Sequence, residues 1–351
     1  MATNFTATAP GKLVIAGEYA VLEGAPAIAA AVNKRAKASV TAAKTGELLI
    51  ANTGIRFPFE LGAGGQPVWS REPGDQGSVL AAVLAALAAG KQFPGGLTPW
   101  KIELCSRDFY AHLSDGSTPK LGIGSSAAVT VALTAALQCC AGGNPDLDLC
   151  LAAHRFLQDG GSGIDVATAW FGGVVLMQPG AEAVPAVRPL SWPAGLHIRP
   201  VWTGVSASTP IMLQRLAAFR QNSGTLYTTV MQRFGTALES ILGHWQLEDA
   251  AALSAGLMYY GELLAEFDRV AEIGIWSDGH RRILDLARSM QVGYKPSGAG
   301  GGDFGLGFSE DQVRLDAFVH EVHAQLVPQT HGVEWGVDGV LINGRGLAAT
   351  T

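Results

Sequence analysis

The amino-acid sequence predicts an α+β fold, and three observations support this class. Strand-like and helix-like stretches are mixed in both halves of the chain, without the regular βαβ alternation of a doubly wound sheet. Hydrophobic residues make up 48% of the 351 residues and charged residues only 15%, which predicts a substantial core. The length suits two lobes or one large domain. Residues 179–195, a loop-rich stretch with four prolines, are the best candidate for a boundary between lobes.

The individual elements are predicted from apolar periodicity and from the glycines and prolines that end each stretch. In the first part we expect a strand at 5–16 broken by Pro10-Gly11, a buried element within 20–32, edge strands over 36–51, a loop over 55–78, a helix at 78–90 and a strand near 100–105. Further on we expect helices at 125–141, 146–157 and 164–171, strands at 172–178 and 197–204, helices across 210–290, and glycine-rich strand structure over 292–308.

Charge and cysteine content exclude several classes of protein. The net charge of −6 argues against a nucleic-acid groove, which needs a basic face. The four cysteines form no C-x-x-C pair, so we expect neither a metal knuckle nor a disulfide framework, and we expect a reducing, cytoplasmic setting. The first residues lack the pattern of a secretory signal, and the longest apolar run, residues 79–89, is too short to span a bilayer. We therefore expect no nucleic-acid partner and no membrane partner.

Residues 120–129, KLGIGSSAAV, combine a lysine, two glycines and two serines at the start of an apolar helix. Glycine lets the backbone approach an anion closely, and the first turn of a helix leaves N–H groups unpaired at its positive end. Gly122, Gly124, Ser125 and Ser126 are therefore candidates for a phosphate cradle, to which Lys120 adds a full charge. A glycine turn with a serine N-cap is the alternative interpretation. The chain contains no Walker A sequence.

Glycine recurs late in the chain, in residues 295–308, KPSGAGGGDFGLGF. Gly300 to Gly305 formally satisfy G-x-G-x-x-G, but their late position counts against a dinucleotide site. A loop that packs its backbone against the first cradle is the other interpretation. Asp303 within this stretch fits either a turn former or a functional residue.

Three further stretches place charges or hydroxyls in apolar surroundings. Residues 9–27 contain Lys12 and Glu18, and burying either charge is costly unless it finds a partner or a ligand. In residues 160–173, Ser162 and Asp165 fit the helix capping box S-x-x-D, which competes with a catalytic role for Asp165. Residues 202–209, WTGVSAST, are predicted as a strand that runs into small hydroxyl residues.

Three motifs, APGKLVIAGEYAVLEG, PKLGIGSSAAV and SGAGGGDFG, occur in this order near the start, middle and end of the chain, and GSGIDVA lies between the second and the third. Together they resemble the motifs of the GHMP kinases, and the resemblance covers nearly the whole chain. It implies two lobes, residues 1–187 with the topology of ribosomal protein S5 domain 2 and residues 188–351 with a ferredoxin-like fold. It also implies ATP in the cleft, its phosphates on the second motif, and Mg²⁺ as cofactor.

Four details resemble the branch of the family that phosphorylates phosphomevalonate: Tyr19, Lys120 before the second motif, WTGVSAST, and Asp303 after the glycines. Mevalonate kinases place a magnesium-binding Glu eleven residues before the catalytic Asp, and counting back from Asp165 that position is His154. The sequence departs from the mevalonate kinase pattern there. The resemblance implies ATP-dependent phosphoryl transfer to 5-phosphomevalonate by a monomer or a homodimer.

The resemblance also implies a role for each motif residue. Lys12, Lys120 and Asp165 are expected to be catalytic. Nucleotide binding is expected at Gly122, Gly124, Ser125, Ser126 and Ala127, with Mg²⁺ on Ser126. The acceptor substrate is expected to bind among Glu18, Tyr19, Ser162, Ser206, Ser208, Gly298, Ala299, Gly300, Gly301 and Asp303.

Several alternatives stay open at this point. An alcohol acceptor, as in a mevalonate kinase or another GHMP kinase, would make Asp165 the natural general base. The chain also fits a diphosphomevalonate decarboxylase, a non-catalytic ATP-binding relative or, from another class, a nicotinamide-binding oxidoreductase. Retention of Lys12, Lys120, Asp165 and Asp303 speaks against the non-catalytic relative, because an inactive site need not keep its charges.

Overall fold

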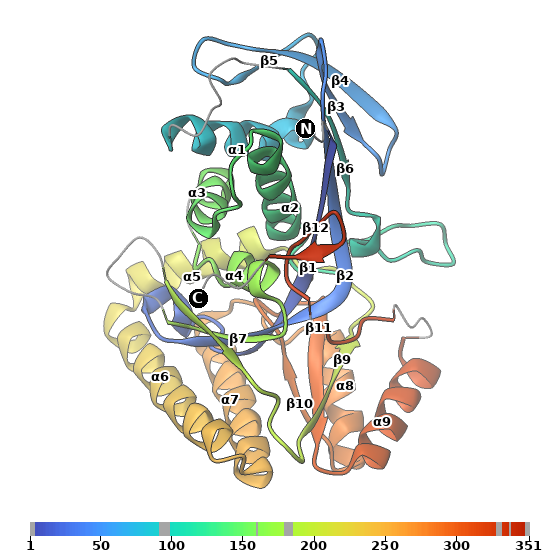
Figure 1. The fold of residues 1–351 in the computed structure, drawn as a ribbon. Helices are drawn as coiled ribbons and strands as arrows, with labels where there is room; N and C mark the ends of the chain where they lie inside the picture. Colours follow the sequence, from blue (N-terminus) through green and yellow to red (C-terminus); the bar gives the residue numbers. More distant parts are fainter. Residues whose placement is uncertain are drawn as a thin grey trace.

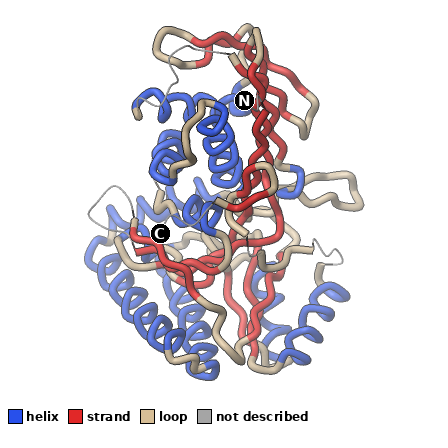
Figure 2. Tube along the Cα trace, viewed as in Figure 1, coloured by secondary structure: helices blue, strands red, loops and turns tan. Residues whose placement is uncertain are grey.

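Among the described residues, two β-sheets and the helices around them make up the fold (Figure 1). The computed structural model describes residues 4–90, 99–158, 161–178, 185–327, 332–336 and 338–347. Most of the larger sheet occupies the upper part of Figure 1, and the smaller sheet lies among the C-terminal helices below it. Figure 2 shows the long strands that run from one part to the other. The predicted α+β class is confirmed, with a mixed sheet.

The larger sheet has the strand order β13-β12-β1-β2-β6-β3-β4-β5, with β7 joined to β2 and β8 joined to β7. Its strands are β1 (Asn4–Ala16), β2 (Ala27–Ala42), β3 (Gly46–Ile50), β4 (Ile55–Leu61), β5 (Pro67–Trp69), β6 (Trp100–Cys105), β7 (Val174–Gln178), β8 (Ala186–Leu190), β12 (Leu341–Ile342) and β13 (Arg345–Gly346). Strands β3 and β6 pair in parallel. The predicted break at Pro10-Gly11 is a shift of register against β2, and β1 continues through it.

Two predictions for this sheet are wrong. Strand β2 pairs with both β1 and β6, and β3 lies between β6 and β4, so residues 36–51 belong to the interior of the sheet rather than to its edges. Residues 55–78, predicted as a loop, contain β4, β5 and a 3-10 helix, Gly74–Gly77. Phe57 and Phe59 point inward and alternate with exposed residues, as a half-buried strand requires. The surrounding glycines and prolines hide this short alternation in the sequence.

Four helices accompany the larger sheet: α1 (Ser78–Ala89), α2 (Ser125–Cys140), α3 (Leu147–Gln158) and α4 (Ile164–Phe171). They confirm the helices predicted for this part of the chain. Helix α2 packs against β1, β2 and the other three helices, which explains why its sequence is apolar on nearly every side. Two short 3-10 turns, Ala20–Glu23 and Arg107–Phe109, complete this part.

The smaller sheet is antiparallel, with the order β10-β11-β9. Its strands are β9 (His197–Trp202), β10 (Gly293–Pro296) and β11 (Phe304–Ser309). The helices around it are α5 (Thr209–Asn222), α6 (Gly224–Gln246), α7 (Ala250–Ala271), α8 (Asp278–Ser289) and α9 (Gln312–Gln325). The helical region predicted across 210–290 is confirmed as α5 to α8.

The division into residues 1–187 and 188–351 stays a prediction. Strand β8 spans that position and pairs with β7 of the larger sheet, while β12, late in the chain, pairs with β1. The larger sheet therefore contains strands from both sides of the predicted boundary. Residues 179–184 of the predicted boundary stretch lie outside the described residues. None of the described helices has both the length and the apolar character needed to cross a membrane.

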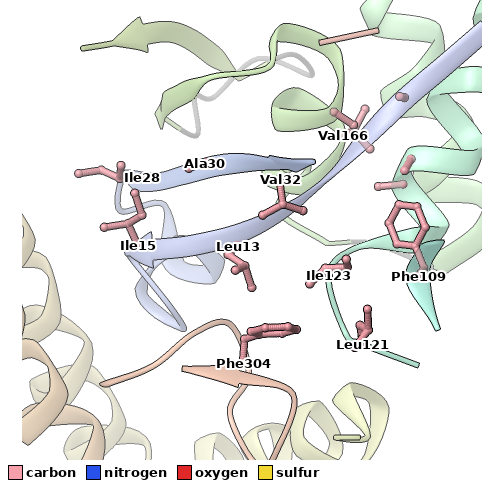
Figure 3. Close-up of a cluster of buried hydrophobic side chains, with 14 of the residues drawn as sticks. Leu13, Ile15, Ile28, Ala30, Val32, Phe109, Leu121, Ile123, Val166 and Phe304 are labelled. Atoms are coloured by element: carbon pink, nitrogen blue, oxygen red, sulfur yellow. The ribbon is translucent and has the colours of Figure 1, made fainter. Parts of the chain in front are cut away.

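The hydrophobic core extends from the larger sheet to the smaller one. Leu13 of β1, Leu121 and Ile123 before α2, and Phe304 of β11 belong to one cluster of buried side chains (Figure 3). Each of these residues is at most 3% exposed. Their burial holds the segment before α2 between β1 and β11, and this segment is the second motif.

Candidate active site

The second motif is a loop in which apolar residues and glycines alternate. Leu121 and Ile123 are buried, whereas Gly122 and Gly124 have φ angles of 70° and 79°. This left-handed backbone is strained for other residues, which explains both glycines. Gly124 is the N-cap residue of α2, and no side-chain hydrogen bond caps the helix, so the alternative of a serine N-cap is wrong. The unpaired N–H groups of this first turn can bind an anion.

Lys12 extends from β1 to the same loop. Its backbone N–H donates to the carbonyl of Ile123 at 2.9 Å. A Cβ added to Gly124 would lie 3.4 Å from Lys12 Cγ and 3.9 Å from Asp165 Cβ. Lys12 and Asp165 come from separate motifs, and the bare glycine lets both side chains converge on the start of α2.

Asp165 lies in the first turn of α4, but the predicted capping box with Ser162 does not form. Gly163 is the N-cap residue, and the Ser162 hydroxyl accepts from the N–H of Ile164 instead. Asp165 Oδ1 accepts from the N–H of Val166 at 2.9 Å. Its other oxygen, Oδ2, lies 3.8 Å from Nε2 of His154 on α3. The Asp165 carboxylate is therefore not engaged in capping the helix.

Asp303 of the third motif packs on the second motif. A Cβ added to Gly122 would lie 2.0 Å from Asp303 Cγ, so only glycine permits this contact. Burial raises the pKa of Asp303 to about 6, and both the N–H of Ala207 and the charge of Lys12 oppose that rise. The late glycine-rich loop therefore lies against the first cradle, but through the Asp303 side chain and not through its backbone as predicted.

Residues 203–208 connect β9 to α5 and fasten the second and third motifs together. Asp303 Oδ1 accepts from the N–H of Ala207 at 3.0 Å, and the Ser206 hydroxyl donates to the backbone carbonyl of Lys120. Ser208 precedes α5 without capping it. The Ser206 side chain thus serves a contact between loops.

Glu18 finds its partner in Lys295 of β10, and both side chains are almost fully buried. Their Nζ and Oε1 atoms are 2.5 Å apart, and Lys295 also donates to the carbonyl of Pro296 at 2.8 Å. Tyr260 donates to the backbone carbonyl of Glu18, and Tyr19 donates to that of Ala299 at 2.6 Å. The side chains of Glu18 and Tyr19 therefore hold the first motif to the C-terminal part of the chain.

The glycines of the third motif face two directions. Gly298 and Ala299 line a cavity next to Lys12. Gly300 and Gly301 instead turn toward the C-terminal helices, because Cβ atoms on them would meet Ile275 at 2.7 Å and Met212 at 3.0 Å, respectively. The structure therefore brings the first pair to the site and uses the second pair for close packing.

Two cavities adjoin at Gln158, and second-motif residues line the larger one. The smaller, of about 180 Å³, is lined by residues that include Lys12, Asp165, Ser162, Gly298 and Ala299. The larger, of about 660 Å³, is lined by residues that include Lys120, Ser125 and Ser126. Gln158 lines both, while Thr209 and Pro210 at the start of α5 line one each. The motif residues are thus divided between two adjoining cavities, as two reactants would require.

Sequence reasoning missed three contributors to this site. Lys295 lies in the glycine-rich stretch, where nothing local marks it as the partner that Glu18 needs. Thr209 belongs to WTGVSAST, which gives it no role separate from its neighbours. The sequence shows His154 only as a departure from the metal-binding pattern, yet the residue is buried beside Asp165. The unpaired charge of Glu18 was the one signal that could have pointed to Lys295.

His280 supports the third motif and predicts a pH effect. Its ring nitrogens contact the Tyr294 hydroxyl at 2.8 Å and the Gly302 carbonyl at 3.0 Å, and burial lowers its pKa to about 4. In the unfolded chain this histidine has a pKa near 6.5, so between pH 6.5 and pH 4 it binds a proton that the folded protein does not bind. The contribution of His280 to stability therefore falls as the pH drops through this range. From pH 7 to pH 5 we expect a loss of about 2 kcal/mol from this group.

Denaturant unfolding of the wild type and His280→Gln at both pH values measures this contribution. The stability difference between the two proteins should shrink at pH 5. Asp303, whose raised pKa acts in the opposite direction, is present in both proteins and drops out of the comparison. His320→Gln, an exposed site on α9, is the control and should leave the pH dependence unchanged. An equal difference at both pH values would contradict a buried, neutral His280.

Comparison with known proteins shows which families and folds the chain resembles. Residues 97–173, which include the second motif, α2, α3 and α4, match the GHMP kinases N terminal domain. The structure of Streptococcus pneumoniae phosphomevalonate kinase, solved with phosphomevalonate and AMPPNP, superimposes with a TM-score of 0.72 at 19% identity, covering 94% of this chain and 98% of that one. Residues 97–173 are therefore similar to the N-terminal domain of the GHMP kinases, and the chain shares its fold with the solved kinase.

Two curated relatives narrow the comparison. Phosphomevalonate kinase of Streptomyces sp. is 29% identical over 347 residues, which cover 88% of this chain and 90% of that protein. Mevalonate kinase of Archaeoglobus fulgidus is 26% identical over 336 residues, which cover 93% and 98%. Both relatives are similar to this chain over most of its length, and one of them is a phosphomevalonate kinase, as the motifs predict.

Proposed function

We propose that this protein transfers the γ-phosphoryl group of ATP to the phosphate of 5-phosphomevalonate, giving 5-diphosphomevalonate and ADP, a step of isoprenoid precursor synthesis. The observation that carries the proposal is the pair of adjoining cavities, with Lys12 and Asp165 in the smaller and Lys120, Ser125 and Ser126 in the larger. The likeness to the Streptomyces enzyme over most of both chains supports this acceptor.

The larger cavity suits the nucleotide. The unpaired N–H groups of the first turn of α2 can bind phosphate oxygens, helped by the Ser125 hydroxyl and the charge of Lys120. Gly124, the N-cap residue of α2, carries no side chain that would keep a phosphate from the backbone of this turn. Gly122 and Ala127 support the turn by packing, Gly122 against Asp303 and Ala127 in the core. The rest of the larger cavity, which Asn52 and Tyr110 line, offers room for the adenosine part of ATP.

Magnesium fits this site as an ion held mostly by the nucleotide. Among the described residues, no group of three histidine, cysteine, aspartate or glutamate side chains could hold a metal alone. Mg²⁺ commonly keeps several waters and binds substrate phosphates with few protein ligands, so the Ser126 hydroxyl is a fitting protein ligand. When bound, Mg²⁺ would neutralise charge on the transferred phosphoryl group.

The smaller cavity suits the acceptor. Ser162, Gly298 and Ala299 line it beside Lys12, and small polar groups of this kind can bind a carboxylate or a hydroxyl. In the transfer, a phosphate oxygen of the acceptor forms a bond to the γ-phosphorus, and the bond from that phosphorus to the β–γ bridging oxygen breaks. The reaction needs positioning and charge neutralisation above all.

With a phosphate acceptor, the reaction does not need Asp165 as a general base. The second pKa of a phosphomonoester is about 6, so the acceptor is mostly a dianion at pH 7 and has little proton to lose. Lys12 and Lys120 are then the critical groups, because they bring two polyanions together. An alcohol acceptor would instead need Asp165 as a general base. The likeness to mevalonate kinase over 93% of the chain makes this the second candidate function.

Two substitutions separate these candidates. For a phosphate acceptor, we expect Asp165→Asn to lower kcat less than Lys120→Met does. The reaction then needs no general base, but it does need the phosphate-binding charge of Lys120. Steady-state kinetics with ATP, Mg²⁺ and 5-phosphomevalonate measures both effects. Loss of turnover in Asp165→Asn together with near wild-type turnover in Lys120→Met would contradict the phosphate acceptor.

The setting of the enzyme also belongs to this proposal. We expect a monomer or a homodimer that acts in the cytoplasm on small molecules. Four cysteines without C-x-x-C spacing support a reducing compartment, and the acidic net charge supports the expectation of no nucleic-acid partner.

A further inference from the structure

His154 is buried in the wall of the smaller cavity with an unused ring nitrogen. It lies on α3, its side chain is only 4% exposed, and it lines the same cavity as Lys12 and Ser162. Nε2 has no hydrogen-bond partner among the described residues. Native proteins pair most buried polar atoms, so an unpaired nitrogen at a cavity wall calls for an explanation.

The carboxylate of Asp165 lies close to this nitrogen. Oδ2 of Asp165 lies 3.8 Å from His154 Nε2, slightly beyond hydrogen-bond distance. The other oxygen of that carboxylate is already bonded to the N–H of Val166. A small movement of either side chain would therefore join Oδ2 to Nε2 and leave neither atom unpaired.

Asp165 presents a difficulty for an anionic acceptor. Its carboxylate is 22% exposed and lines the cavity that would receive a phosphate dianion, and like charges at short range in a partly buried site repel strongly. Lys12 alone offsets the Asp165 charge only in part, because its charge also acts on Asp303 and must attract the phosphates. A second group that draws the Asp165 charge away from the acceptor would lower this repulsion.

We infer that His154 is a positioning residue that turns the Asp165 carboxylate away from the acceptor phosphate and thereby permits an anionic acceptor. The inference rests on the proposed function. The Nε2–H group of His154 donates to Asp165 Oδ2, and this hydrogen bond holds the negative charge of the carboxylate toward α3. The free cavity wall beside Lys12 then accepts the phosphate.

Removing the Nε2 donor should change substrate binding more than turnover. The acceptor carries its negative charge both in the bound state and in the transition state. Removing the group that draws the Asp165 charge away therefore weakens the binding of both states to a similar extent. We expect His154→Leu to raise KM for 5-phosphomevalonate about tenfold or more, the effect of one hydrogen bond to a charged group, with kcat little changed. KM for ATP should stay at the wild-type value.

Rescue and coupling distinguish this role from a merely structural one. The amide nitrogen of His154→Gln can reach the place of Nε2, so this variant should keep KM close to the wild-type value. The asparagine side chain of His154→Asn is too short to reach this place, so this variant should behave like His154→Leu. If the Leu variant does not fold, the Asn variant is compared with the Gln variant instead. In an Asp165→Asn background, His154→Leu should raise KM no further, because the charge that it acts on is gone.

Steady-state kinetics of these variants, with Arg155→Leu on α3 as a control outside both cavities, decides the matter. A raised KM in the Leu and Asn variants, rescue in Gln and no further effect with Asp165→Asn support the inference. An unchanged KM, or the same rise of KM in the Asp165→Asn background, overturns the inference about His154. The proposed function still stands in that case if the wild-type enzyme is active on 5-phosphomevalonate. A wild-type enzyme that is inactive on 5-phosphomevalonate overturns both.

Discussion

Replacing Lys12 with methionine is expected to lower kcat about a thousandfold, the effect typical of removing one preorganised group that stabilises charge. Lys12 lines the smaller cavity and packs beside Gly124 at the start of α2, so its charge lies close to the proposed sites of both reactants. Methionine keeps the length of the side chain and much of its packing but removes the charge. Two polyanions would then have to approach each other beside Asp165 and Asp303 without that cation.

Initial rates at saturating ATP and acceptor measure this effect. Lys37→Met is a matched control, because Lys37 is an exposed lysine on the neighbouring strand β2. That variant should keep wild-type kcat. Retention of more than a tenth of wild-type kcat in Lys12→Met would show that the charge of Lys12 is dispensable and would contradict its central place in the site.

The second large effect concerns stability. Lys295→Met should lower the free energy of unfolding by about 3–5 kcal/mol, because it leaves the carboxylate of Glu18 buried without a countercharge. Both partners are at most 1% exposed, so water cannot take the place of the lysine. The loss should also loosen the contact between the first motif and β10, which the Glu18 carboxylate makes with Lys295.

Denaturant unfolding of three variants tests this account. Glu18→Gln combined with Lys295→Met removes both charges and should recover much of the lost stability, since no uncompensated charge is left. Arg281→Met breaks an exposed ion pair with Asp278 and should cost at most about 1 kcal/mol. If Lys295→Met were no more destabilising than Arg281→Met, the buried pair would not hold these segments together.

Local patterns in the sequence predict the elements with strong periodicity or clear ends. Helix α2 is predicted well because its apolar run begins after Gly124 and closes before further glycines. Strand β4 is missed because its alternation covers only seven residues and lies among glycines and prolines. The central position of β2 is missed because strand order depends on partners far along the chain.

The site shows the same limit. The second motif predicts its own loop, since glycine and helix start are local features. The contact of Asp303 with Gly122 and the pair of Glu18 with Lys295 join residues far apart in sequence, 277 positions apart in the second case. One sequence shows only that Glu18 needs a partner, while the fold supplies Lys295. The capping box of Ser162 and Asp165 matches its pattern and still does not form, because Gly163 takes the N-cap position.

The central claim is that the acceptor is a phosphate group, and one assay tests it most directly. Purified protein with ATP and Mg²⁺ is supplied with 5-phosphomevalonate or with mevalonate, and formation of ADP and of the phosphorylated product is followed. We expect kcat/KM for 5-phosphomevalonate to exceed that for mevalonate by a wide margin, with 5-diphosphomevalonate as product. Turnover of mevalonate with none of 5-phosphomevalonate would contradict the claim and would make Asp165 the general base of an alcohol kinase.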